Sequence, residues 1–330
     1  MQYQYLGKTN IRVSEICLGT MMFGGKTSPD EAERIMLKAL NSGINFFDTA
    51  NVYEDGRSEE IVGQTLTSRR DQVVLATKFG FPAADPPNQQ GLSRTNIIRA
   101  LEDSLRRLKT DYIDLYYVHW PRYEMHLESL LRTLDDFVRQ GRVRAIGVSN
   151  FPAWLLCRSL WLSEVRNLTS LVVLQVPYNL IERGIEVEVL PLCEAENVAV
   201  VPYRPLAIGI LTGKYLKSVD LDTRGATDDR VPTWNERYRD AIAKLASSAN
   251  RKWNKSATQV AIAWVRDHPA VTSAIVGISR VEQLDELLTM EDWHLSAQER
   301  EEIGSWFPTA VWEESGGEYP NWRKAYRILR

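Results

Sequence analysis

The segment GINFFDTANVYEDGRSEEIVG, residues 43–63, contains a strand pattern, a polar loop and a helix pattern in direct succession. Its apolar beginning predicts a buried strand over 44–48 that ends at Asp48. Tyr53 follows in a loop that contains Gly and Asp, and a helix pattern begins at Ser58. Why an acid stands at the end of a buried strand, with a phenol just beyond it, is decided by what ends the other strands.

Short strand patterns alternate with longer helix patterns over most of the chain. Strands are predicted at 16–19, 44–48, 73–77, 112–118, 143–149, 171–176, 198–203 and 272–276. Helical periodicity is found at 29–42, 58–68, 93–108, 126–140, 152–166, 186–196, 256–267 and 280–290. Eight strands, each followed by a helix, are typical of parallel βα units that close into a barrel. The predicted fold is α/β, a (β/α)8 TIM barrel, with an N-terminal hairpin, a long loop at 204–235 after the seventh strand, and an irregular C-terminal tail from Trp306.

The predicted helix ends rest on residues that favour such positions. Helices are expected to start at Pro29, Ser58, Ser93 and Ser256, and two are expected to stop near Gly43 and Gly141. Glu59 and Glu60 would then form an ordinary acidic first turn of the helix that Ser58 caps.

Composition limits the class of protein. The chain has 330 residues, 44% of them hydrophobic and 25% charged, so we expect one globular domain over 1–330 with a substantial core. A net charge of −3 with interspersed signs predicts no nucleic-acid or membrane-surface partner. No apolar run reaches the roughly 18 residues of a membrane span, and the N-terminal segment MQYQYLGKTN lacks the basic-then-apolar pattern expected of a signal peptide. The cysteines, which form no CxxC pair, predict free thiols in a reducing cytoplasm: Cys17, Cys157 and Cys193.

Polar residues follow nearly every predicted strand. In a barrel of this kind the carboxyl ends of the strands carry the chemistry. The residues found there are Asp48, Lys78, His119, Ser149, Asn150, Gln175 and Tyr203. Taken singly, Asp48 reads as a turn acceptor, Lys78 as a solvated charge and His119 as a core histidine. Taken together with Tyr53, they form an acid, an amine, an imidazole and a phenol at adjacent strand ends.

Such a group can transfer a proton. A phenol with a pKa near 10 is a poor acid at neutral pH, but a neighbouring ammonium favours the phenolate and a carboxylate keeps that ammonium charged. A tyrosine in this setting could protonate a carbonyl oxygen while a hydride arrives at the carbon. The glycine-rich run GTMMFGG does not match GxGxxG, so the pattern does not indicate a Rossmann site.

These residues lie in segments that resemble the aldo-keto reductase family. GINFFDTANVYEDGRSEEIVG resembles a signature of that family, and YYVHWP resembles its histidine strand. Further segments resemble family motifs in the expected order: GVSNF, LQVPYNL, VPYRPLAIGILTGKY and AIVGISRVEQLDE. The resemblance extends from about residue 3 to about residue 295, and the joint occurrence of six ordered motifs makes it specific.

The resemblance implies a barrel that binds NADP(H) and holds no metal, with Asp48, Tyr53, Lys78 and His119 as the catalytic tetrad. It implies that Tyr53 is the general acid, that Lys78 lowers its pKa, and that Asp48 pairs with Lys78. It also implies that His119 orients the substrate carbonyl or assists the proton transfer. The cofactor contacts that it implies are Gly19, Thr20, Met21, Asp48, Ser149, Asn150, Gln175, Tyr203, Arg204, Pro205, Leu206, Lys214, Arg224, Gly277, Ser279, Arg280, Gln283 and Glu286. Two positions depart from the family: Arg204 replaces the usual Ser, either near the pyrophosphate or pointing to solvent, and Leu287 replaces the usual Asn near adenine.

The implied substrate is a small carbonyl compound or sugar, and the oligomeric state stays open. The expected pocket residues are Met22, Phe23, Tyr53, Phe79, His119 and Trp120, with Met21, the 204–235 loop and the tail residues Trp312, Tyr319 and Trp322. Two other functions remain. One is an aldose or alcohol dehydrogenase working oxidatively, and the other is a non-catalytic NADP-binding subunit similar to potassium-channel β subunits. Since those subunits typically carry Asn at the histidine position, His119 favours an enzyme.

Overall fold

The computed structural model describes residues 1–81, 91–122, 125–216 and 228–308. A short antiparallel hairpin comes first, formed by β1 (Tyr3–Tyr5) and β2 (Arg12–Ser14). Eight parallel strands follow: β3 (Ile16–Gly19), β4 (Phe46–Asp48), β5 (Val74–Phe79), β6 (Ile113–Val118), β7 (Val143–Ser149), β8 (Val173–Gln175), β9 (Ala199–Val200) and β10 (Ala274–Gly277). The predicted hairpin and the eight predicted strands are therefore confirmed, although β9 is only two residues long.

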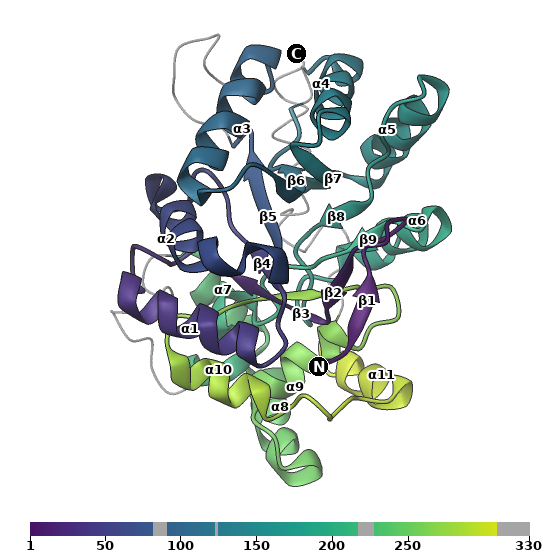
Figure 1. Ribbon diagram of the computed structural model, residues 1–330. Helices are drawn as coiled ribbons and strands as arrows, with labels where there is room; N and C mark the ends of the chain where they lie inside the picture. The colour runs from purple at the N-terminus through teal and green to yellow at the C-terminus, as the bar shows by residue number, and fades with distance from the viewer. Residues whose placement is uncertain (82–90, 123–124, 217–227, 309–330) are drawn as a thin grey trace.

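The strands form a closed barrel. Their order in the sheet is β10-β3-β4-β5-β6-β7-β8-β9, so β3 to β9 pair in sequence order and the last strand, β10, pairs with the first, β3. The remaining gap, between β9 and β10, is bridged by two backbone bonds, from Thr272 N to Val200 O and from Ile275 N to Pro202 O. Figure 1 shows the strands at the centre and the helices around them. The (β/α)8 barrel predicted from the sequence is the fold of the chain.

Eleven helices are present in the described part of the chain. They are α1 (Pro29–Asn41), α2 (Arg57–Leu66), α3 (Arg94–Leu108), α4 (Leu127–Arg139), α5 (Ala153–Val165), α6 (Val189–Glu196), α7 (Arg230–Arg237), α8 (Arg239–Trp253), α9 (Ala257–Arg266), α10 (Val281–Leu288) and α11 (Ala297–Ser305). The sequence prediction missed α7, α8 and α11. The described part of the expected 204–235 loop contains short 3-10 turns at Ala207–Thr212 and Lys214–Leu216 and the start of α7.

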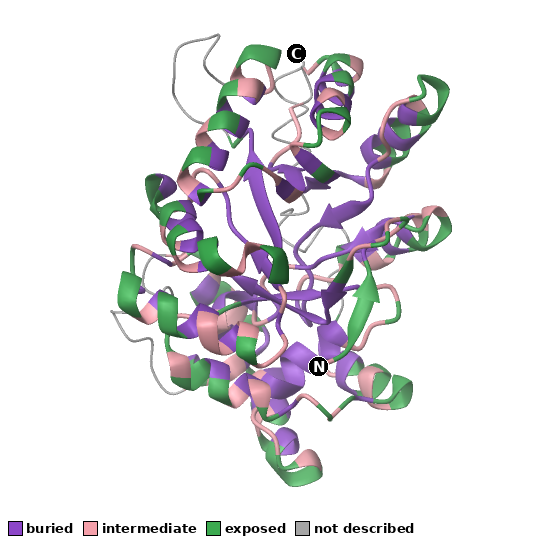
Figure 2. Cartoon of the chain, viewed as in Figure 1, coloured by how far each residue is buried: buried purple, intermediate pink, exposed green. Residues whose placement is uncertain are grey.

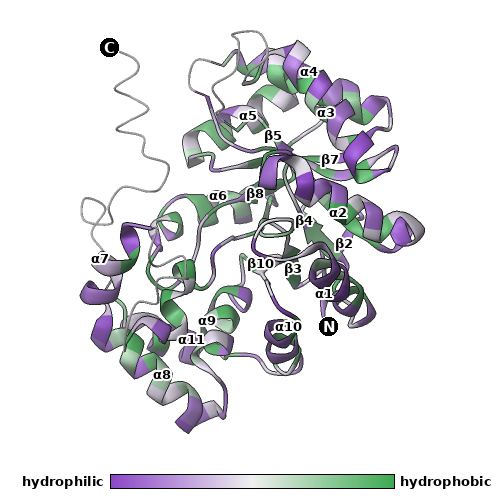
Figure 3. Cartoon of the chain, turned by 90° about the vertical axis from the view of Figure 1, so that its left-hand side faces the viewer, coloured by the Kyte–Doolittle hydropathy of each residue, from purple (hydrophilic) through white to green (hydrophobic). Residues whose placement is uncertain are grey.

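The core consists of two layers. Side chains that point into the barrel form an inner cluster that includes Cys17, Phe46 and Tyr117, and the hairpin contributes Leu6 and Val13 to it. Alternate strand residues point outward and pack against the helices in a larger cluster. Figure 2 shows the barrel strands as buried, the hairpin strand β1 as exposed, and most helices with both buried and exposed residues. The hydropathy colours in Figure 3 show the corresponding mixture of hydrophilic and hydrophobic residues along the helices.

One predicted helix cap is wrong. Ser28, Ser93 and Ser256 do cap α1, α3 and α9, because each side chain accepts a hydrogen bond from a backbone N–H in the first turn. Ser58 does not cap α2, which starts after Gly56. The Ser58 side chain is fully buried, and its hydroxyl donates to the Thr20 carbonyl at 2.9 Å. The residue that looked like a cap instead joins α2 to the loop after β3.

No helix in the described ranges is long and apolar enough to cross a membrane.

The close approach of α2 to α3 gives a prediction about stability. A Cβ atom added at Gly63 would lie 2.5 Å from the backbone of Arg107 and Leu108, so Gly63→Ala must push α2 away from α3. We expect a loss of about 1–3 kcal/mol, measured by chemical denaturation. Gly184→Ala is the matched control, since an added Cβ there meets nothing within 4 Å. Equal unfolding midpoints for the two variants would contradict the packing argument.

Candidate active site

The ammonium of Lys78 is the centre of the site. Lys78 lies on β5 and is fully buried. Its Nζ forms an ion pair with Asp48 at the end of β4, donates to the Thr49 carbonyl at 2.7 Å, and donates to the Tyr53 hydroxyl at 3.2 Å. An ammonium has three donors, and these three acceptors use all of them. The structure thus brings three of the four expected catalytic residues into direct contact.

The backbone explains why these residues meet. Strands β4 and β5 are parallel neighbours, so Asp48 and Lys78 leave the sheet at the same end. The Asn51 N–H donates to the Lys78 carbonyl, and the Tyr53 N–H donates to the Ala50 carbonyl. These bonds fold the chain after β4 back over β5, and the phenol of Tyr53 comes to lie above the lysine.

Burial and charge act against each other in this cluster. Burial raises the pKa of Asp48, although the Lys78 ammonium opposes that shift. Burial alone would lower the pKa of Lys78, but the charges of Asp48 and Tyr53 outweigh it, so the pKa of Lys78 is raised. A second donor also holds the carboxylate, because Gln175 Nε2 donates to Asp48 Oδ2 at 2.8 Å. The lysine therefore stays charged inside the barrel.

His119 lies beside the phenol at the end of β6. Its ring meets the Tyr53 ring edge-on, with 5.9 Å between ring centres, and the ring of Phe81 lies 5.2 Å away. Burial, together with the nearby Lys78 charge, holds the pKa of His119 well below its usual value. The imidazole is therefore neutral at ordinary pH. A neutral imidazole can offer one donor and one acceptor to a polar group next to Tyr53.

The expected nicotinamide contacts form one network beside the tetrad. Asn150 follows β7 in a left-handed conformation, with φ 63°, and its amide nitrogen donates to the His119 carbonyl at 3.1 Å. That nitrogen lies 3.0 Å from Ser149 Oγ, and the Tyr203 hydroxyl donates to Asn150 Oδ1 at 2.8 Å. Burial raises the pKa of Tyr203 to about 12, so its hydroxyl keeps its proton.

The residues after β3 also reach this end of the barrel. Gly19 lies opposite Asp48 in the sheet, and the Thr20 hydroxyl donates to the Asp48 carbonyl at 3.0 Å. Met21 is 41% exposed, and Met22 is partly exposed. An exposed methionine therefore follows directly after the threonine that bonds to Asp48.

The structure separates the expected pocket residues into two groups. Met22, Tyr53 and Trp120 keep exposed surface, and His119 lies beside Tyr53. Phe23 and Phe79 are fully buried and belong to the outer core, where Phe79 stacks on Tyr116 at 4.6 Å. These two rings therefore belong to the core between the strands and the helices. Trp312, Tyr319 and Trp322 lie outside the described residues.

Comparison with known proteins identifies the family. The sequence model of the aldo/keto reductase family matches residues 15–306 of this chain. The chain belongs to the aldo/keto reductase family. It is 39% identical to the uncharacterized oxidoreductase YrpG of Bacillus subtilis, over 97% of this chain and 98% of that protein. It is 33% identical to the aldo-keto reductase YhdN of the same organism, over 97% of each chain. It is also 33% identical to a probable voltage-gated potassium channel subunit beta of Arabidopsis thaliana, over 88% of this chain and 92% of that one.

Membership of the aldo/keto reductase family supports an oxidoreductase, and this family generally uses nicotinamide cofactors. The segment after β10 is the expected adenosine end. Gln283 Oε1 accepts from the Ser279 N–H at 2.9 Å, and Glu31 accepts from the Val281 N–H at 2.8 Å. The backbone N–H groups of Ser279 and Val281 are thus already bonded to side chains of this chain. Arg280 is exposed there and has no ion-pair partner in the described part of the chain.

The other expected cofactor residues lie in several places. Gly277 ends β10 and is exposed, while Glu286 is held by α9 through a hydrogen bond from Ser256. Pro205 and Leu206 follow Tyr203, and Lys214 is exposed just beyond them. Leu287, the departure noted near adenine, is buried. Arg224 lies outside the described residues.

The structure gives Arg204 a partner within the chain. The sequence left two alternatives, the pyrophosphate or solvent. The guanidinium is mostly buried, pairs with Glu182 at 3.4 Å and lies 5.0 Å from the centre of the Tyr203 ring. The sequence prediction missed this partner, because Glu182 lies in a loop far from Arg204 in the chain. Arg204 therefore contacts the ring that is expected to stack on nicotinamide.

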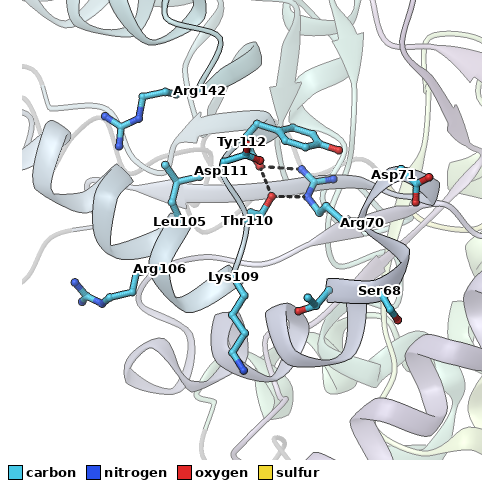
Figure 4. Close-up of a pocket in the computed structure, with 11 residues that line it drawn as sticks. Ser68, Arg70, Asp71, Leu105, Arg106, Lys109, Thr110, Asp111, Tyr112 and Arg142 are labelled. Atoms are coloured by element: carbon cyan, nitrogen blue, oxygen red, sulfur yellow. Dashed lines mark hydrogen bonds between the residues drawn. The ribbon is translucent and has the colours of Figure 1, made fainter.

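A surface hollow of about 950 Å³ lies at the other end of the barrel. Figure 4 shows its lining, in which Arg70 donates to Thr110 and to the Tyr112 carbonyl. These residues precede β5 and β6, whereas Lys78 and His119 lie at the carboxyl ends of the same strands. In barrels of this kind that amino-terminal face contributes to stability. The hollow is therefore separate from the candidate active site.

The neutral state of His119 predicts a pH effect on stability. In the unfolded chain this imidazole gains a proton near pH 6.5, while the folded protein resists protonation. Stability should therefore fall as the pH drops below about 6.5, by at most about 1.4 kcal/mol per pH unit for this group. His119→Gln should reduce that slope between pH 7 and 5 in denaturation curves. His268, whose pKa burial lowers to about 4, adds a similar slope to both proteins. An unchanged slope would contradict the assignment.

Proposed function

We propose that this aldo/keto reductase reduces an aldehyde or ketone to the alcohol, with NADP(H) as cofactor and Tyr53 as proton donor. The observation that supports this proposal is the contact of Lys78 Nζ with both the Asp48 carboxylate and the Tyr53 hydroxyl. A buried, charged lysine in that position favours the phenolate, and so makes the phenol a better acid than it is in water. Proton donation to a carbonyl oxygen is the chemistry that such a phenol supports.

Each residue has a defined task in this proposal. The Tyr53 hydroxyl gives its proton to the carbonyl oxygen, and the resulting phenolate faces the Lys78 ammonium. Asp48 keeps that ammonium charged and in place. His119, neutral and beside the phenol, orients the carbonyl oxygen toward Tyr53. When bound, the nicotinamide would supply the hydride that the carbonyl carbon receives.

The residues at the strand ends fit such a cofactor. Ser149, Asn150 and Gln175 place hydroxyl and amide groups beside the tetrad, which suits hydrogen bonding to a carboxamide. The ring of Tyr203 is partly exposed, and Asn150 fixes its hydroxyl. An aromatic ring held rigidly in this way can stack on another planar ring. Arg280, and Arg224 beyond the described residues, would contact the adenosine phosphate.

Two alternatives use the same residues. The phenolate could instead accept a proton from an alcohol, so an aldose or alcohol dehydrogenase running oxidatively needs no other group. A regulatory role is the second alternative, since one relative is named as a probable potassium channel subunit beta. A turnover assay with NADPH and an activated aldehyde separates an enzyme from a subunit that only binds the cofactor. A panel of aldehydes, ketones and sugars then defines the substrate class.

The proton donor is tested by Tyr53→Phe. Loss of the hydroxyl should lower kcat by about 10²–10⁴-fold, the usual range for general acid catalysis. NADPH binding, measured by fluorescence titration, should be nearly unchanged, because the phenol is not expected to anchor the cofactor. Tyr112→Phe is the matched control, since Tyr112 lies at the other end of the barrel. Near-normal turnover by Tyr53→Phe would refute the assignment.

The preference for NADPH is tested at Arg280. The 2′-phosphate of NADPH carries roughly two negative charges, and an arginine contact to it is worth about 1.5–3 kcal/mol. Arg280→Ala should therefore weaken NADPH binding by roughly 10- to 150-fold and leave NADH binding unchanged. Lys252→Ala, which removes a cation bound to Glu302, is the control. Equal dissociation constants for the two cofactors in the unmodified protein would rule out the preference.

A further inference from the structure

The turn that carries Tyr53 has an unusual backbone. After Tyr53, three consecutive residues have positive φ angles: 47° at Glu54, 55° at Asp55 and 91° at Gly56. Glycine adopts this conformation readily, but residues with a side chain do so only when their surroundings hold them there. The position of the phenol above Lys78 therefore depends on contacts that fix the chain just after the turn.

A buried carboxylate supplies such contacts. Glu59, in the first turn of α2, is fully buried. Its Oε1 accepts from the Thr77 hydroxyl at 2.5 Å, and its Oε2 accepts from Arg107 Nε at 2.7 Å. The sequence correctly placed Glu59 in an acidic first turn, but it gave no sign that this carboxylate is buried and bonded. A carboxylate with no exposed surface needs these partners, because an unpaired buried charge is strongly destabilising.

The partners of Glu59 connect the turn to the catalytic strand. Thr77 immediately precedes Lys78 on β5, so one side chain points toward the helices and the other into the barrel. Glu59 therefore links the helix that follows Tyr53 to the strand that carries Lys78. Tyr53 and Lys78 are therefore connected in two ways: directly inside the barrel, and outside it through α2, Glu59 and Thr77.

Arg107 touches the turn itself. It lies near the end of α3, and a Cβ added at Gly56 would lie 3.0 Å from its Cδ. The guanidinium that pairs with Glu59 therefore also packs against the last left-handed residue of the turn. The absence of a side chain at Gly63 lets α2 approach α3 closely enough for this contact.

We propose that the Glu59–Arg107 pair is a positioning device that holds the left-handed turn at residues 54–56 and so keeps the Tyr53 hydroxyl on Lys78. Glu59 and Arg107 are positioning residues, because neither contacts the Tyr53 hydroxyl in the described structure. This inference rests on the proposed role of Tyr53 as proton donor. It assigns to Glu59 an effect on the chemical step, in addition to any effect on folding.

The test compares Glu59→Gln, which removes the charge and keeps the shape, with the unmodified protein. Displacement of the phenol should lower kcat by about 10- to 100-fold, the range expected for misplacing a reacting group by about 1 Å. The dissociation constant of NADPH, measured by fluorescence, should stay within about twofold, because the predicted cofactor contacts do not involve α2. Arg107→Met should behave in the same way, and Arg107→Lys, which keeps a charge near Glu59, should lose less.

A matched control separates positioning from general loss of stability. Arg70 pairs with Asp114 at 2.6 Å and is also mostly buried, but it lies at the opposite end of β5. Arg70→Met should lower the unfolding temperature and leave kcat of the folded protein unchanged. If Arg70→Met lowers kcat as much as Glu59→Gln does, the positioning role is wrong.

The decisive experiment is a double-mutant cycle with Tyr53→Phe. If Glu59 acts through the phenol, Glu59→Gln should cause little further loss of kcat once the hydroxyl is absent. Multiplying losses would overturn the inference and leave the proposed function standing. Near-normal kcat for Tyr53→Phe alone would instead overturn the proposed function. The two failures therefore give different results.

Discussion

A charged lysine buried inside the barrel is the constraint on which the site depends. Burial opposes the charge of Lys78, so its ammonium needs an acceptor for every donor. Asp48, the Thr49 carbonyl and the Tyr53 hydroxyl are those acceptors. Since the phenol completes the coordination of the lysine, the requirement that keeps the charge buried also determines where Tyr53 lies. The same set of contacts therefore stabilises the ion pair and positions the proposed proton donor.

The topology of the barrel brings the groups around Lys78 together. Parallel neighbours bring Asp48, Lys78 and His119 to one end of the sheet without any sequence proximity. Contacts outside the barrel then fix the loops that the strands carry. Ser58 binds the loop after β3, and Glu59 binds β5 and α3. The site is consequently supported from two sides, by the sheet within and by helices α2 and α3 around it.

Periodicity and strand-end polarity were sufficient to predict the barrel and the residues that meet at Lys78. Partners that depend on three-dimensional packing were not predictable in this way, as Glu182 beside Arg204 shows. Ser58 was misread as a cap because serine is common at helix starts, and Glu59, correctly placed in the first turn, was not recognised as buried because acids are common there. Their spacing carried a signal, since Glu59 is in phase with the buried residues Val62 and Leu66. Helices α7, α8 and α11 were missed because the prediction assigned one helix to each strand.

Transfer of a label tests the central claim most directly. The protein would be mixed with an activated aldehyde and NADPH carrying deuterium at both positions of nicotinamide C4, and the products examined by mass spectrometry. If the cluster around Lys78 supports carbonyl reduction, one deuterium should appear on the former carbonyl carbon for each NADPH oxidised. Binding of NADPH without any transfer of deuterium, across a panel of aldehydes, ketones and sugars, would contradict the account and favour a regulatory subunit.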